Sequence, residues 1–294
     1  MTEAAEVRQR DRPDVAPPVL DVRDLHAEFA GPSGAVAAVR GVSLRVGRGE
    51  RVAVVGESGC GKSTLALAVL GLLDPPGQVT KGEVWLNDRD ISLLNDREMS
   101  RIRGKEISLI FQDAMNALDP VKTVGSQIID TIRRHQPEMS QRMARKRAVE
   151  LLVEVDVPAA ARRLDDFPHQ YSGGMRQRVM IAIAIANDPD LVIADEPTTA
   201  LDVTTQAQVL ELLDRLATER GAAIVLITHN LGVVAEFCET VQVMYAGRFV
   251  ESAPADHIFD SSLHPYTDAL INSMPGPDQL EADRLPFIPG YPPD

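Results

Sequence analysis

Apolar residues follow two spacings along the chain, and each spacing predicts a different kind of element. From Val19 to Val46, apolar and polar positions alternate on both sides of a Gly-Pro-Ser-Gly turn, which predicts an antiparallel sheet. Short apolar runs predict strands at 52–55, 107–111, 191–196 and 222–227, of which the one at 191–196 is expected to be buried. A further short strand is expected at 82–87, and the segments 241–245 and 248–251 predict a hairpin. Core strands that alternate with helices imply a mainly parallel sheet with its chemistry at the carboxyl ends of the strands.

The apolar spacing changes to that of helices between Asp113 and Gln170. Ala148, Leu151, Leu152 and Val155 follow the i, i+3, i+4, i+7 pattern of one helix face. We therefore expect a helical subdomain at about 113–170, inserted into an α/β core that spans 19–252. Residues 1–18 combine prolines with mixed charges and predict a disordered tail, and 253–294 form a C-terminal extension with a helix expected from Pro265 to Met274.

A glycine-rich segment joins the strand at 52–55 to a helix expected from Leu65 to Leu73. It reads G-x-x-x-x-G-K-S, in which glycines let successive N–H groups face a phosphate and the helix N-terminus adds positive potential. Lys62 would reach the β- and γ-phosphates, and the Ser63 hydroxyl would bind Mg²⁺. The alternative is a tight strand-to-helix turn that happens to carry a lysine. The residues expected to bind nucleotide here are Gly56, Ser58, Gly59, Cys60, Gly61, Lys62, Ser63 and Thr64.

Polar side chains end several of the other predicted strands. Asp195 would hold Mg²⁺, and Glu196 would polarise water against the γ-phosphate, unless the two carboxylates merely cap the next helix near Thr198. Gln112 would contact Mg²⁺ or the attacking water, although most glutamines are surface residues. His229 would contact the γ-phosphate and orient the water, although a core or surface histidine is the alternative.

Two further sites complete the candidate set. Ser172 is a good helix N-cap, and Gly173 and Gly174 leave the first N–H groups of that helix approachable by a phosphate. Phe29 is the aromatic residue beside the first turn, where it either stacks on a purine ring or packs in the core.

Composition narrows the class of protein. The chain has 294 residues, of which 44% are hydrophobic and 25% charged, as in soluble globular proteins. Its net charge of −13 argues against a general nucleic-acid binder, and Cys60 and Cys238 have neither metal-ligand nor disulfide-framework spacing. The longest apolar run, Val179 to Ala186, is too short to span a membrane, and the N-terminus has no apolar signal core, so we expect a cytoplasmic protein.

The order of these motifs resembles the ATP-binding cassette (ABC) ATPases over about 19–251. The motifs are the phosphate loop, Gln112, Ser172-Gly173-Gly174, Asp195-Glu196, Ala200-Leu201-Asp202 and Thr228-His229. The resemblance implies that Phe29 stacks on adenine, that 171–175 is the family signature, that the loop with Asp202 lies at a dimer interface and that His229 is the switch histidine. Met175 departs from the usual glutamine, but the Ser-Gly-Gly is intact, so we expect little functional cost.

Other motifs resemble the dipeptide, oligopeptide and nickel importer branch of this family. They lie at 111–120, 167–178, 264–267 and 288–293. This resemblance implies an ATPase that uses ATP and Mg²⁺ at the cytoplasmic face of the membrane. Its partners would be a second cassette, two membrane permease subunits and an extracytoplasmic solute-binding protein, with no nucleic acid. Branch members usually continue into a cysteine-bearing segment that sometimes holds an iron–sulfur cluster; no cysteine follows Cys238, so we expect no cluster.

Alternative functions come from different classes of protein. A soluble cassette ATPase of DNA repair or translation typically has a long coiled coil or two cassettes in one chain, and this sequence has neither. A degenerate subunit would bind ATP only as a scaffold, which the presence of Glu196 and His229 argues against. Peptides are the solute that the resemblance favours, while nickel, opines and oligosaccharides stay open.

Overall fold

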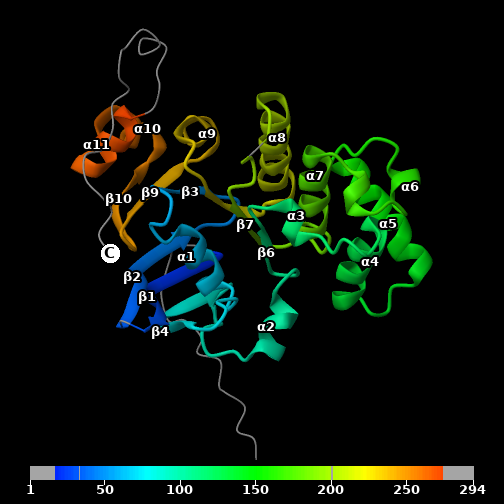
Figure 1. The fold of residues 1–294 in the computed structure, drawn as a ribbon, viewed down its shortest axis with the longest axis horizontal. Coiled ribbons are helices and arrows are strands. Elements are labelled where there is room, and N and C mark those ends of the chain that lie inside the picture. The colour runs from blue at the N-terminus through cyan, green and yellow to red at the C-terminus, as the bar shows by residue number, and fades with distance from the viewer. Residues whose placement is uncertain (1–16, 33, 200, 274–294) are drawn as a thin grey trace, which may run out of the picture. The chain divides into compact units, whose positions relative to one another are not determined.

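The computed structural model describes residues 17–32, 34–199 and 201–273 (Figure 1). The contacts among these residues divide them into two compact units. Unit 1 contains the described residues up to Leu94 and from Val225 onwards, and unit 2 contains Asn95–Ile224. Most of the expected tail and the motif at 288–293 lie outside the described residues.

The first sheet of unit 1 is antiparallel, as the alternating sequence predicted. Its order is β2-β1-β4-β5, with β1 at Leu20–Gly31, β2 at Gly34–Val46, β4 at Gly77–Leu86 and β5 at Arg89–Asp90. The sequence predicted a later start for β4, at Gly82. The strand begins at Gly77 because the polar segment before Gly82 also pairs with β1, where Gly77 lies opposite Phe29.

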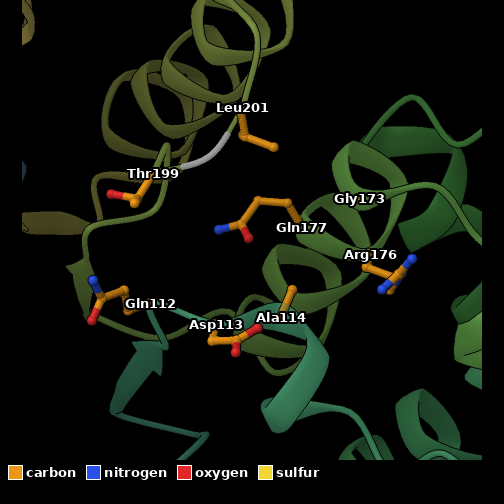
Figure 2. Close-up of a pocket in the computed structure, with 8 residues that line it drawn as sticks. All are labelled: Gln112, Asp113, Ala114, Gly173, Arg176, Gln177, Thr199 and Leu201. Atoms are coloured by element: carbon orange, nitrogen blue, oxygen red, sulfur yellow. The ribbon is translucent and has the colours of Figure 1, made fainter.

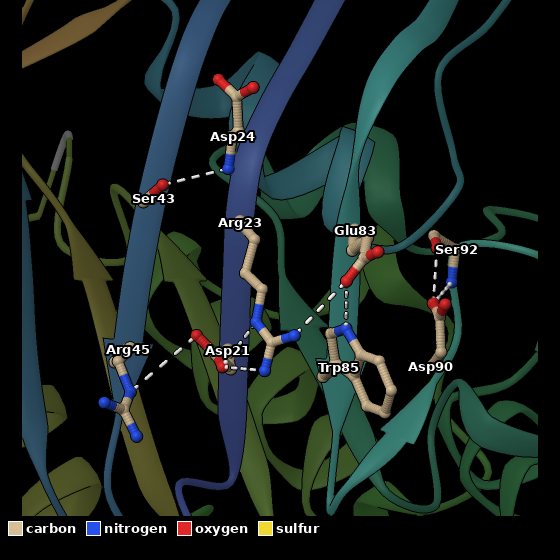
Figure 3. Close-up of polar contacts among 9 residues, drawn as sticks. All are labelled: Asp21, Arg23, Asp24, Ser43, Arg45, Glu83, Trp85, Asp90 and Ser92. Carbon is tan, nitrogen blue, oxygen red and sulfur yellow. Dashed lines mark hydrogen bonds and ion pairs between the residues drawn. The ribbon is translucent and has the colours of Figure 1, made fainter. Parts of the chain in front are cut away.

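A polar network holds neighbouring strands of this sheet together (Figure 3). The Arg23 guanidinium lies 2.8 Å from Asp21 Oδ2 and 3.4 Å from Glu83 Oε2, and its Cζ lies 5.0 Å from the centre of the Trp85 ring. Glu83 also accepts a 2.8 Å hydrogen bond from Trp85 Nε1. Arg23 thus satisfies the buried Asp21 carboxylate within β1, and its contacts with Glu83 and Trp85 join β1 to β4.

The second sheet of unit 1 carries the phosphate loop. Its order in this unit is β10-β9-β3-β8, with β3 at Arg51–Val55, β9 at Thr240–Tyr245 and β10 at Arg248–Pro254. β8 spans Ala223–Ile227, and its residues from Val225 onwards belong to this unit. β3 and β9 run parallel, and β9 and β10 form the predicted hairpin. The helices of the unit are α1 (Lys62–Val69), α9 (Leu231–Phe237), α10 (Ala255–Ser261) and α11 (Pro265–Asn272). α1 ends before the expected Leu73, and Gly71 follows it with a left-handed φ of 60°.

Unit 2 combines two parallel strands with most of the helices. β6 (Ile107–Ile110) pairs with β7 (Leu191–Asp195), and both strands are largely buried, as continuous apolar runs predict. The helices are α2 (Asp96–Ile102), α3 (Ala114–Ala117), α4 (Val124–His135), α5 (Gln141–Glu154), α6 (Ala160–Arg163), the 3-10 helix η1 (Pro168–Gln170), α7 (Gly173–Ala184) and α8 (Val203–Arg220). The elements α3 to η1 fall within the helical insert that the sequence predicted.

Side-chain caps and an apolar face define the helices of the insert. Thr123 caps α4 and Ser140 caps α5, each accepting a hydrogen bond from a backbone N–H of the first turn. α4, α5 and α7 contact one another through faces that include Ile128, Ile132 and Leu152, all fully buried. Among the residues described, no helix is long and apolar enough to cross a membrane.

We predict that Leu152→Ala lowers the free energy of unfolding by about 2–5 kcal/mol, because it removes buried apolar contacts and leaves a cavity. Leu152 is 0% exposed, whereas the next residue of α5, Val153, is 60% exposed. The matched control Val153→Ala should therefore change stability by less than about 0.5 kcal/mol. Urea unfolding followed by circular dichroism measures both variants, and equal losses would show that α5 does not pack through this face.

Candidate functional site

The phosphate loop links β3 to α1 and holds its lysine in a defined place. Lys62 is the first residue of α1 and is buried, and its Nζ donates hydrogen bonds of 2.8 Å to the carbonyl oxygens of Gly56 and Glu57. Buried ammonium groups need such partners. The loop therefore fixes the Lys62 cation against its own backbone.

The exposed part of the loop surrounds the start of α1. Ser58, Gly59 and Ser63 are exposed and Thr64 is half-buried. Gly61 is the N-cap of α1 with a φ of 109°, and as a glycine it has no side chain to cap the first turn. The N-terminus of α1 gives its first N–H groups a positive potential suited to an anion.

Cys60 takes a structural position in the loop. Burial raises the pKa of its thiol, although the nearby Lys62 ammonium opposes this shift, and Sγ lies 3.8 Å from Lys62 Nζ. Its backbone N–H donates to the Glu57 carbonyl at 3.3 Å, and its carbonyl accepts from Gly247 N–H at 2.9 Å. The backbone of Cys60 thus joins the loop to the turn of the β9–β10 hairpin.

His229 lies at the carboxyl end of β8, in the same unit as the phosphate loop. The preceding Thr228 donates its N–H to the Val54 carbonyl at 3.2 Å, two residues before the loop begins. Thr228 Oγ1 then accepts from Asn230 N–H at 3.0 Å, and Asn230 caps α9. This turn exposes His229 at the sheet edge that also carries the loop.

Phe29 lies on β1, also in unit 1, and is half-buried. Its ring packs over Gly77 of β4, where an added Cβ would lie 2.6 Å from Phe29 Cε1. Gly77 thus leaves room for the ring, and half-burial leaves part of it accessible. Stacking on a base and packing in the core both stay possible for this ring.

Unit 2 brings Gln112 and Glu196 together, as the strand ends predicted. Gln112 Nε2 donates to Glu196 Oε2 at 3.0 Å, and β6 and β7 are parallel neighbours, so their carboxyl ends meet. Thr199 Oγ1 donates to the same carboxylate oxygen at 2.8 Å. Sequence reasoning missed Thr199, whose only signal is its position three residues after Glu196. The two donors hold the Glu196 carboxylate in one orientation.

Asp195 and Glu196 do not cap the helix that follows them. Asp195 is the last residue of β7 and is buried. The cap of α8 is Asp202, whose carboxylate accepts from Thr205 N at 3.0 Å and from Thr205 Oγ1 at 2.7 Å. The Thr205 backbone N–H and then its hydroxyl lower the pKa of Asp202. The structure therefore removes the capping alternative for the Asp-Glu pair and gives Asp202 a structural role.

The predicted signature residues start α7. Ser172 Oγ accepts from Met175 N at 3.3 Å, which makes Ser172 the N-cap as expected. An added Cβ at Gly173 meets no atom within 4 Å, whereas one at Gly174 would lie 2.8 Å from Thr205 Cγ2. Gly174 thus allows α7 to approach α8, and Gly173 faces open space. Ala200, part of the other predicted motif here, lies outside the described residues.

An open cavity of about 490 Å³ lies within unit 2 and joins these segments (Figure 2). Its lining residues are Gln112, Asp113, Ala114, Gly173, Arg176, Gln177, Thr199 and Leu201. Gln177 is 5% exposed, points into the cavity, and has an Nε2 without a hydrogen-bond partner among the described residues. Sequence reasoning missed Gln177, because glutamines in apolar helices carry no signal of their own.

A tyrosine of the C-terminal extension also reaches the phosphate loop. The hydroxyl of Tyr266 on α11 accepts a 3.0 Å hydrogen bond from the backbone N–H of Glu57. The sequence singled out 264–267 only as a resemblance, and nothing in the motif indicated a contact 209 residues away. Unit 1 thus contains the loop, Phe29, His229 and Tyr266, and unit 2 contains Gln112, the signature, Asp195, Glu196 and Asp202.

Comparison with protein families covers most of the chain. Residues 39–199 match the family described as ABC transporter, and 250–294 match the one described as oligopeptide/dipeptide transporter, C-terminal region. Among curated relatives, the oligopeptide transport ATP-binding protein OppD of Mycobacterium tuberculosis is 53% identical over 94% of this chain. This chain spans only 45% of that relative's length.

Relatives that are shorter, and a solved structure, are also similar to this chain over most of its length. OppD of Bacillus subtilis and the dipeptide transport ATP-binding protein DppD of Lactococcus lactis are each 48% identical over 94% of this chain, which covers 77% and 79% of them. A dimeric post-hydrolysis state of the ATP-binding cassette MJ0796, bound to ADP and Pi, is 30% identical with a TM-score of 0.73, over 80% of this chain and 98% of that one. The chain belongs to the ABC transporter family and carries the C-terminal region of its oligopeptide/dipeptide members.

Proposed function

We propose that this chain is the ATP-hydrolysing subunit of an ABC importer that drives the uptake of di- or oligopeptides. The observation that carries the proposal is that one chain holds both the hydrogen-bonded Glu196 of a cassette ATPase and the C-terminal region of oligopeptide/dipeptide transporters. The names of the relatives, oligopeptide and dipeptide transport ATP-binding proteins, favour peptides over nickel, opines or oligosaccharides.

Nucleotide binding would use both the loop and the strand ends. Lys62 would exchange its contacts with loop carbonyls for the β- and γ-phosphates, and Phe29 would stack on adenine. Ser63, Gln112 and the buried Asp195 supply oxygen ligands of the kind that Mg²⁺ prefers, with few carboxylates and the remaining positions left to phosphates and water. The metal would neutralise charge that develops on the phosphates.

Hydrolysis would depend on Glu196. Its carboxylate is held by Gln112 and Thr199, and it would accept a proton from the attacking water. His229 would contact the γ-phosphate from the end of β8 and orient that water. Pre-set orientation of the base matters because a small misplacement of reacting groups costs much of the rate.

We further propose that each ATP is shared by two cassettes. Both Lys62 and Gly173 lie at helix N-termini whose positive potential suits a triphosphate. In a head-to-tail pair, the loop of one cassette would face Ser172, Gly173 and Gly174 of the other, with Asp202 close to the shared surface. Two cassette structures similar to this chain are dimeric, which supports the proposal. The second cassette would be another copy or a related chain.

The same proposal places the chain at the cytoplasmic face of the membrane, bound to two permease subunits and served by an extracytoplasmic solute-binding protein. Residues 113–125 would contact a permease, because Gln112 joins this segment to Glu196 and would report loss of the γ-phosphate to the helices. A cysteine introduced within 113–125 should crosslink to a permease cytoplasmic loop. Crosslinks that form only from 253–273 would contradict this contact.

The transport proposal is tested in the source cell by expressing Glu196→Gln. This variant should occupy the transporter without turnover and reduce the uptake of a radiolabelled tripeptide, with the uptake of radiolabelled nickel as the comparison. Loss of nickel uptake with normal peptide uptake would assign the chain to another solute. The binding protein that co-purifies with the complex, and its ligand, provide an independent check.

We predict that Glu196→Gln retains ATP binding and loses about 10²- to 10⁴-fold in turnover, because the amide keeps the shape but cannot accept a proton. Lys62→Ala should instead weaken ATP binding itself. Phosphate release and equilibrium binding of a fluorescent ATP analogue separate the two effects. Glu211→Gln, at an exposed position on α8, is the matched control and should behave as wild type. Steady hydrolysis by Glu196→Gln would move the base to another residue, with His229 the next candidate.

Phe29→Ala should raise the dissociation constant for ATP roughly 5- to 150-fold, since stacking of a base on an aromatic ring is worth about 1–3 kcal/mol. Val36→Ala is the control, because Val36 is the cross-strand neighbour of Phe29 on β2 and is exposed. If Phe29→Ala lowers the melting temperature and leaves ATP affinity unchanged, Phe29 is a core residue.

Mixing two inactive variants tests the shared site in a chain that pairs with itself. Gly173→Asp adds a negative charge where a Cβ meets no neighbour, so it should spare the fold and the nucleotide affinity of its own loop. Mixed with Lys62→Ala, it leaves one of two sites in a mixed dimer free of both changes, and hydrolysis should partly return. No recovery, despite mixed dimers seen by native mass spectrometry, would contradict the shared site.

A further inference from the structure

The C-terminal extension contacts the phosphate loop through the hydroxyl group of a tyrosine. Tyr266 Oη accepts from Glu57 N–H at 3.0 Å, and both residues belong to unit 1. Figure 1 shows α11 beside the β9–β10 hairpin, and the Tyr266 ring lies 4.5 Å from the Tyr245 ring at the end of β9. Tyr266 is itself buried. The contact therefore joins two segments that separate family models match.

The residues around Tyr266 fix its position. His264 caps α11 by accepting Tyr266 N–H on Nδ1 at 3.1 Å, and Pro265 occupies the first helical turn. Glu251 on β10 accepts the N–H groups of Leu263 at 2.7 Å and His264 at 3.1 Å. The start of α11 is thus tied to the hairpin, and the tyrosine ring is held between the hairpin and the loop.

The hydroxyl of Tyr266 stays protonated at physiological pH. Burial, together with the nearby Glu57, raises the pKa of Tyr266 to about 12, although the hydrogen bond from the Glu57 backbone opposes this shift. A neutral hydroxyl can accept the Glu57 N–H without placing a negative charge beside the phosphate site. It therefore suits a loop that binds a triphosphate.

Glu57 is one of the two loop residues whose carbonyl groups accept hydrogen bonds from the Lys62 ammonium. Its carbonyl accepts the Lys62 ammonium at 2.8 Å and the Cys60 N–H at 3.3 Å. Tyr266 therefore holds the N–H of Glu57, while the C=O of Glu57, in the next peptide group, positions Lys62. Losing the Tyr266 hydrogen bond would let the loop, and with it the ammonium group, move.

We propose that Tyr266 is a positioning residue for the triphosphate of ATP, so that the C-terminal region completes the phosphate site of its own chain. This inference rests on the proposed role of the loop in nucleotide binding. The role proposed for the His264-Pro265-Tyr266 segment needs no second cassette. His264 sets the start of α11, and Tyr266 holds Glu57 and, through it, Lys62.

The test is Tyr266→Phe in the full chain, which removes the hydroxyl and keeps the ring. We expect about a 2- to 10-fold weaker affinity for ATP and ADP, as for the loss of one hydrogen bond, with a matching rise in KM and little change in kcat. Affinity for AMP should not change, because Lys62 would contact only the β- and γ-phosphates. A merely structural role would affect all three nucleotides alike.

Tyr245→Phe is the matched control, because it removes the hydroxyl of the neighbouring ring and preserves the ring contact. It should match wild type in every nucleotide affinity. Equal losses in both variants, or unchanged ATP affinity in Tyr266→Phe, would overturn the proposal. Amide hydrogen exchange of Glu57 without nucleotide should be faster in Tyr266→Phe. That readout stays valid if the wild-type chain proves not to bind ATP, so failure of the contact and failure of the proposed function are distinguishable.

Discussion

Two close approaches of backbone to backbone hold the phosphate loop, and the rest of the site depends on them. An added Cβ at Gly56 would lie 2.2 Å from the Met244 carbonyl oxygen, and one at Gly61 would lie 2.3 Å from that of Ala38. Both residues also have positive φ, at 152° and 109°. Only glycine meets both demands. The loop is therefore pressed against β9 and β2, and this contact places Lys62 where its ammonium meets the loop carbonyls.

A second constraint acts at the base expected to activate water. Glu196 has a left-handed φ of 46°, which is unfavourable for a residue with a Cβ. Its carbonyl accepts from Thr199 N–H at 3.2 Å, while its carboxylate accepts from Gln112 and Thr199. These bonds stabilise the unusual backbone and fix the carboxylate at the end of β7. The left-handed backbone at Glu196 thus costs local conformational energy, and it sets the position of the Glu196 carboxylate.

Much of this arrangement could be predicted from local sequence. Continuous apolar runs predicted β3, β6, β7 and β8, and the polar residues expected at the ends of β6 and β7 do meet, as the Gln112–Glu196 hydrogen bond shows. The features that the sequence did not predict include contacts between residues that are distant in sequence. The early start of β4 comes from pairing with β1, and the Tyr266–Glu57 bond joins residues 209 positions apart. The sequence also did not predict that the Asp202 carboxylate caps α8, and the expected place of Asp202 at a dimer interface stays a prediction.

The phosphate loop lies in unit 1, and Ser172, Gly173 and Gly174 lie in unit 2. The central claim is our proposal that ATP hydrolysis needs the loop of one cassette and these signature residues of another. Phosphate release measured while mass photometry records the oligomeric state tests it most directly. The account predicts that chains that stay monomeric bind one ATP each through Lys62 and hydrolyse it slowly, with specific activity rising as dimers form or a partner cassette is added. Full activity from a sample that remains monomeric throughout the assay would contradict it.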